Sequence, residues 1–151
     1  MPEWNLTGSR MFSHAAKFID AYHMVLQPLC RATGLPPMAV DILLFIANNP
    51  ENNTASNVCQ CRGLKPGIVS VHVDRLVNEG LLVRAESVND RRKTRLACTE
   101  KARPVIEEGR RLQKAFAARL ADGIAESDME SFRRTLARFG QNLEGILHHG
   151  L

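Results

Sequence analysis

Residues 64–99 constrain the fold of this chain most strongly, because two different hydrophobic patterns follow each other there. The first part is LKPGIVSVHVDRLVNEG, in which apolar residues recur at helical spacing up to Gly80, a residue type that commonly ends helices. The second part is LLVRAESVNDRRKTRLACT, which reads as two short strands at 81–85 and 94–98 joined by a basic turn. The sequence therefore predicts an amphipathic helix followed directly by a β-hairpin with a cationic tip.

The positive charge of the chain is concentrated in the same region. Eight Lys and Arg residues but four Asp and Glu residues lie between positions 62 and 95, so this stretch holds the whole formal excess of +4. A groove-sized helix beside an arginine-tipped hairpin is the layout of a winged helix-turn-helix, which most often binds double-stranded DNA. A solvated basic face is the alternative explanation. The position of the charge at the hairpin tip favours a polyanionic partner.

Length and composition fit a single domain with a core of its own. The chain has 151 residues, of which 44% are hydrophobic and 24% are charged. No window approaches the roughly 18 consecutive apolar residues that a membrane-spanning helix requires. The N-terminus also lacks the basic and apolar regions of an export signal. We therefore expect a cytoplasmic protein without a membrane partner, organised as one domain over residues 1–151.

A long apolar stripe lies near the N-terminus. Between residues 11 and 30, apolar residues recur at alternating steps of three and four, which is typical of a helix packed along another helix. Pro28 is expected to kink or end this helix. Shorter helices are expected at 38–48 and at 55–62, the second capped by Thr54. Together with the hairpin, these segments predict a mostly α-helical chain with a small β-hairpin wing.

A second apolar stripe lies near the C-terminus. A long helix is expected from Glu100, and a last helix from a capping box formed by Ser127 and Glu130. Two such stripes exceed what one small winged lobe needs for its own core, so we expect them to pair with a second copy of the chain. Packing of both stripes within one chain is the alternative. The residues expected in the dimer interface are Phe12, Ile19, Tyr22, Leu26, Phe132, Leu136, Phe139 and Leu143.

The segment GLLVRAESVNDRRKTRLACTEKA at residues 80–102, with VDRL at 73–76, resembles the MarR family of bacterial transcription regulators. It matches the family's wing in Gly-Leu before a strand, Asp-x-Arg at the tip, a returning strand and Thr-Glu-Lys-Ala opening a helix. The resemblance implies an obligate dimer that binds DNA through two winged lobes and is most often a repressor. The winged lobe would then span 35–99 and the N- and C-terminal dimerisation helices 9–33 and 100–149.

The resemblance and the helical pattern together give the candidate DNA-binding residues. By position, Arg92 resembles the family's wing arginine, which enters the minor groove of DNA. Asp90 resembles the carboxylate that orients this arginine. A guanidinium suits a narrow, electronegative groove. Arg91 and Lys93 are expected to contact phosphates. The outward sector of the preceding helix completes the set with Lys65, Gly67, Ile68, Ser70, Val71, His72 and Arg75.

The composition of this helix also predicts the kind of DNA that it reads. Gly67, Ile68 and Val71 offer no side-chain hydrogen bonds to bases, but apolar side chains can contact thymine methyl groups. We therefore expect an A/T-rich palindromic operator with half-sites about one helical turn apart. The resemblance further implies release by a small molecule; a small aromatic compound is the expected effector, and the sequence does not indicate which residues bind it.

Two other functions stay open from the sequence. A redox- or metal-responsive regulator would act through cysteines, with Cys30 near the expected dimer seam as the candidate. Cys59 and Cys61 are two positions apart on a helix and point roughly 200° away from each other, which disfavours a shared metal. A winged helix used for protein–protein assembly would predict a neutral wing, in contrast to the basic run at 91–93. No arrangement typical of a catalytic, metal or cofactor site is recognisable, so we expect no enzyme activity and no cofactor.

Overall fold

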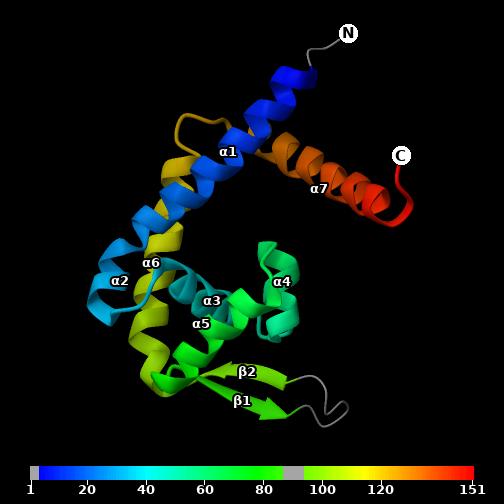
Figure 1. The fold of residues 1–151 in the computed structure, drawn as a ribbon. Coiled ribbons are helices and arrows are strands. Elements are labelled where there is room, and N and C mark those ends of the chain that lie inside the picture. The colour runs from blue at the N-terminus through cyan, green and yellow to red at the C-terminus, as the bar shows by residue number, and fades with distance from the viewer. Residues whose placement is uncertain (1–3, 87–93) are drawn as a thin grey trace. The chain divides into compact units, whose positions relative to one another are not determined.

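The computed structural model describes residues 4–86 and 94–151, which form a mostly helical protein with a two-stranded antiparallel hairpin (Figure 1). Its contacts divide the chain into two compact units, one ending at Phe116 and one comprising Ala117–Leu151. The elements are α1 (Trp4–Val25), α2 (Gln27–Thr33), α3 (Pro37–Asn48), α4 (Ala55–Arg62), α5 (Pro66–Asn78), β1 (Leu82–Glu86), β2 (Thr94–Cys98), a 3₁₀ turn η1 (Glu100–Ala102), α6 (Arg103–Leu120) and α7 (Glu126–His149).

The N-terminal helical segment is interrupted where the sequence predicts it. α1 begins earlier than expected, at Trp4, and ends at Val25, while α2 carries Pro28 in its first turn. A proline is tolerated there because its missing N–H would have no helical partner. α2 ends at Thr33 and is capped by Gly34, whose φ of 72° lies in the left-handed region that favours glycine. The expected break at Pro28 is thus confirmed as a separation into two helices.

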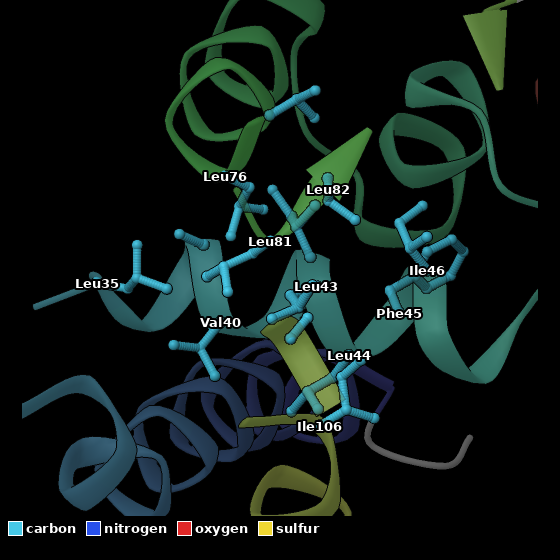
Figure 2. Packing of buried hydrophobic residues seen from close by; sticks show 14 of the residues in the cluster. Leu35, Val40, Leu43, Leu44, Phe45, Ile46, Leu76, Leu81, Leu82 and Ile106 are labelled. Atoms are coloured by element: carbon cyan, nitrogen blue, oxygen red, sulfur yellow. The ribbon is translucent and has the colours of Figure 1, made fainter. Parts of the chain in front are cut away.

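The core of the first unit is built around α3. Eight consecutive residues of this helix, from Ala39 to Ile46, are buried, so α3 is enclosed on all sides rather than amphipathic. Figure 2 shows its side chains packed against Leu76 of α5, Leu81 and Leu82 at the start of the hairpin, and Ile106 of α6. The segments that carry the expected site therefore pack on one common helix.

The strands of the hairpin lie close to the expected positions. β2 has the expected bounds, whereas β1 begins at Leu82, one residue later than expected. Leu81 instead forms the connection, since its N–H donates to the carbonyl of Leu76 and its carbonyl accepts from Thr99. The antiparallel register pairs Leu82 with Cys98 and places Leu82 and Leu96 in the core.

Two expectations about the terminal helices are wrong. α7 begins at Glu126 after Ala125 and has no side-chain cap, so the capping box of Ser127 and Glu130 does not form. Acidic residues in its first turn, Glu126 and Asp128, still favour the positive end of the helix dipole. Leu26 is fully buried in the core of its own chain and therefore cannot form part of an open dimer face.

The remaining members of the two stripes differ in exposure. Phe12 and Ile19 on α1 are exposed, whereas Tyr22 is half-buried against Phe116 of α6. On α7 none of the residues is buried. The exposed apolar residues of α7 include Phe132, Leu136, Phe139 and Leu143.

Close packing between α3 and α6 requires a glycine at position 109. A Cβ atom added to Gly109 would clash with both Cδ atoms of Leu44, which is fully buried and has little room to move. We expect Gly109→Ala to reduce the free energy of unfolding, because overpacking costs about 1–3 kcal/mol and exceeds the roughly 1 kcal/mol gained in helix propensity. Urea unfolding followed by circular dichroism measures this change.

Gly67→Ala is the matched control, because a Cβ atom at Gly67 meets no atom within 4 Å. Its free energy of unfolding should stay the same or rise slightly. Equal stability of the Gly109 variant and the parent protein would contradict the close packing of α6 on α3.

Candidate nucleic-acid interface

α4 and α5 form the two helices of a helix-turn-helix. The side chain of Thr54 accepts a hydrogen bond from the N–H of Asn57 at 3.1 Å, and Oδ1 of Asn57 accepts one from the N–H of Thr54 at 3.2 Å. This capping box confirms Thr54 as the N-cap of α4. α4 ends at Arg62 and is capped by Gly63, with φ of 63°; three residues, the first of them Gly63, separate it from α5. The start of α4 and the turn after it are thus fixed by local interactions.

α5 has the two faces that its sequence predicts. Val69, Val73 and Leu76 are buried against the core. The opposite face is open, with 44% of Ile68 and 67% of Val71 exposed. The other predicted residues on or beside this face are the exposed Lys65, Gly67, Ser70 and Arg75 and the half-buried His72. α5 therefore presents an outward surface that is apolar near its centre and basic towards both ends.

His72 and Arg75 are more constrained than the sequence suggests. Partial burial, and then the nearby charge of Arg75, lower the pKa of His72, so its imidazole is neutral at pH 7. Arg75 donates from Nη2 to the carbonyl oxygen of Gly34 at 2.7 Å. The recognition helix is thereby tied to the C-terminal end of α2, a long-range contact without any sequence signal.

The hairpin is fastened to the helix-turn-helix through both of its strands. On β1, Arg84 forms an ion pair with Asp74 of α5. On β2, Leu96 donates from its N–H to the carbonyl of Asn53 at 2.8 Å, beside an antiparallel bridge between Arg95 and Thr54. The base of the hairpin accordingly lies beside α5 (Figure 1).

The pair of Arg84 and Asp74 also changes the charge of the outward surface. A free carboxylate on the exposed side of α5 would repel a polyanion, and the neighbouring guanidinium offsets it. Both side chains are about half exposed, so we expect less than about 1 kcal/mol of stability from the pair. Its effect is mainly to orient β1 against α5.

The α4–α5 turn is supported from the core by a second ion pair. Arg62, the last residue of α4, donates from Nε to Oδ2 of Asp41 on α3 at 2.8 Å. Asp41 is the buried charged residue in the part of the chain whose burial is described. Sequence reasoning missed it because a single Asp within an apolar helix gives no indication of its partner.

The wing-tip residues lie outside the residues that the structure describes. Asp90, Arg91, Arg92 and Lys93 fall between the end of β1 and the start of β2. Their assignment as minor-groove and phosphate contacts stays a prediction from the sequence.

The cysteine named as the redox candidate lies inside the protein. Cys30 is buried, and burial raises the pKa values of the Cys30 and Cys98 thiols, which disfavours the reactive thiolate. Within residues 4–86 and 94–151, no group of three or more His, Cys, Asp or Glu residues is placed to hold a metal ion. No single described helix is long and apolar enough to cross a membrane; α2 and α3 pass that test together as a bent pair, by length and composition only.

Comparisons with known proteins agree with this geometry. A sequence model of the MarR family matches residues 33–93, from the end of α2 through the helix-turn-helix and into the hairpin. A MarR-family transcriptional regulator from Rhodococcus sp. RHA1 is 24% identical over 90% of this chain and 93% of its own, with a TM-score of 0.70.

Two further solved structures were determined with bound molecules. CouR from Rhodococcus jostii RHA1, bound to p-coumaroyl-CoA, is 25% identical over 86% of this chain and 88% of its own, with a TM-score of 0.68. A MarR-family regulator from Listeria monocytogenes, complexed with 26mer DNA, is 16% identical over 89% of this chain and 87% of its own, with a TM-score of 0.75. The segment of residues 33–93 is thus similar to the MarR family, and the chain has the winged helix-turn-helix fold of these solved regulators.

Proposed function

We propose that this chain binds an A/T-rich palindromic operator as a homodimer, and that it represses transcription until a small molecule releases it. The observation that carries the proposal is the outward face of α5 beside a hairpin fastened to the same helix-turn-helix. Such a module places its second helix in the major groove. The Listeria monocytogenes regulator, which has the same fold, was determined with 26mer DNA, and this supports DNA as the partner.

The side chains of the outward face favour contacts with thymine methyl groups. Ile68 and Val71 are exposed apolar residues near the centre of that face, and methyl groups in the major groove distinguish thymine from the other bases. No atom lies within 4 Å of the place where Gly67 would carry a Cβ atom, so DNA can approach the backbone there. We therefore propose A/T-rich half-sites separated by about one helical turn.

Selection of duplexes from a random pool with the purified protein should return A/T-rich inverted repeats. Sequencing of the retained DNA reads both the base composition and the half-site spacing. Half-sites rich in G and C would contradict the methyl-contact argument, since those base pairs present no thymine methyl group.

Arg92→Ala should weaken binding to the selected duplex strongly, because it removes a guanidinium proposed to enter the narrow minor groove. We expect a loss of at least about fivefold, which corresponds to about 1 kcal/mol, the lower end of what one specific contact contributes. Fluorescence anisotropy measures the affinity, and light scattering checks that the molecular mass is unchanged. Arg111→Ala is the control, because Arg111 lies on α6 and pairs with Glu108, away from the hairpin. Equal affinity of both variants would exclude the proposed role of Arg92.

Exposed apolar residues support the dimer. Phe12 is 83% exposed on α1, and the row of large apolar residues on α7 is open along its length. Water-exposed surfaces of this kind are uncommon on monomeric proteins and mark interaction sites. A second copy of the chain would cover both helices symmetrically and present two α5 helices to one palindrome.

Leu136→Glu should produce monomers, because it places a charge within the proposed apolar interface. Light scattering at several protein concentrations measures the mass. Lys114→Gln, an exposed change on α6 that lowers the net charge by the same amount, is the matched control. A variant at Leu136 with the mass and DNA affinity of the parent protein would rule out α7 as an interface.

An aromatic cluster supports a small aromatic effector. The rings of Phe18 and Tyr22 on α1 lie 5.3 and 5.5 Å from that of Phe116 on α6, and Phe18 is half exposed. CouR was determined with an aromatic thioester, p-coumaroyl-CoA. A ligand that binds the DNA-free form better than the DNA-bound form releases the operator. Adding p-coumarate or p-coumaroyl-CoA to the DNA-binding assay tests this class directly.

A further inference from the structure

The ion pair between Asp41 and Arg62 is held in a specific geometry. Besides the contact through Nε, Arg62 donates from Nη2 to Oδ1 of Asp41 at 3.3 Å, so the guanidinium uses both carboxylate oxygens. Its Cζ atom also lies 5.0 Å from the centre of the Phe45 ring. Two hydrogen bonds and one aromatic contact together fix both the position and the plane of this side chain.

The two partners come from elements with different roles. Asp41 belongs to α3, which is enclosed by the core of the unit, and its side chain is 9% exposed. Arg62 is the last residue of α4, and the chain passes through Gly63, Leu64 and Lys65 before α5 begins. The pair thus connects the rigid centre of the lobe to the short turn from which the recognition helix departs.

We propose that Arg62 is a positioning residue for DNA reading, which together with Asp41 sets the direction in which α5 leaves the turn. The inference rests on the proposed binding of DNA by α5, and it adds a specificity determinant that does not itself contact bases. Displacing α5 relative to the hairpin would misplace its base contacts while leaving the basic charges on the surface. Specific binding should therefore suffer more than binding to arbitrary DNA.

The energetics of this ion pair, in which Asp41 is buried and the Arg62 side chain is 37% exposed, favour a positioning role over a stabilising one. Removing two charges from water costs about as much as their attraction returns, so an apolar pair of similar volume often stabilises a protein equally well. An apolar pair fills the same space but has no preferred orientation of the kind that two hydrogen bonds impose. Geometry is therefore the property that such a replacement would lose.

Arg62 stays charged beside Asp41, and the neighbouring Tyr22 adds no charge at pH 7. Burial lowers the pKa of Arg62, but the hydrogen bonds and charge of Asp41 outweigh it and raise that pKa overall. Burial, with a contribution from Asp41, raises the pKa of Tyr22 to about 12, so this neighbour is neutral at pH 7. Tyr22 is instead engaged as a neutral acceptor, since Gln113 donates to its hydroxyl at 2.8 Å.

The test uses the double variant Asp41→Leu with Arg62→Met, which removes both charges and keeps apolar volume at the site. The DNA probes are the duplex selected with the parent protein and a shuffled duplex of the same composition and length. We expect the ratio of the two affinities to fall at least about tenfold, the order of one lost base contact. Affinity for the shuffled duplex should change by less than about twofold, because the phosphate contacts persist.

Thermal unfolding separates positioning from loss of folding. We expect the double variant to unfold no earlier than the parent protein. If it does not fold, Arg62→Lys decides instead, because an ammonium group keeps the charge but cannot form the bidentate contact. An unchanged affinity ratio in the folded variant would overturn the inference.

The control is the double variant Glu108→Gln with Arg111→Gln, which removes an exposed ion pair of α6 and is also neutral in net charge. Its affinity ratio should equal that of the parent protein. If the parent protein selects no duplex at all, the proposed operator binding fails before the role of Arg62 is reached, and the two failures are thereby distinguished.

Discussion

The winged lobe depends on the burial of one helix, α3, on all of its sides. A helix that contributes eight consecutive residues to the core cannot shift without disturbing every neighbour, because protein interiors are close-packed. α5, the base of the hairpin and α6 all pack against it (Figure 2). The surface proposed to face DNA is therefore held in place by α3, a core helix that is not part of that surface. Gly109 of α6 shows how closely a neighbouring helix approaches α3.

Polar contacts between elements then set the finer geometry of the site. Arg84 pairs with Asp74 between β1 and α5, Arg62 pairs with Asp41 between α4 and α3, and Arg75 donates to Gly34 at the end of α2. We expect each of these contacts to add little to the free energy of unfolding, because the attraction between the partners is offset by the loss of their hydrogen bonds to water. Each one instead limits how two elements can turn relative to one another. A DNA-reading surface requires this property, because base contacts depend on distances of a few tenths of an ångström.

The exposed apolar residues connect the fold to the proposed regulation. A homodimer through α1 and α7 would present two recognition helices at one separation, and a palindrome is read when both fit at once. A ligand that binds better to a dimer with another distance between the two α5 helices would weaken the binding of both half-sites. The aromatic cluster of Phe18, Tyr22 and Phe116 joins α1 to α6 within the first unit, and α6 in turn packs against α3 at Gly109.

The sequence by itself determined the local structure: the break before Pro28, the Thr54 cap, the two faces of α5 and the hairpin, each of which follows from neighbours a few residues apart. It did not place the start of α7, because Ala125 precedes a favourable acidic turn without a capping side chain. It also assigned Leu26 to a dimer face, since helical periodicity does not reveal which side of a stripe meets its own chain. Only the tertiary structure decided that Arg62 meets Asp41 and that Arg75 meets Gly34. Those partners are 21 and 41 positions apart, and only the packing of whole helices brings them together.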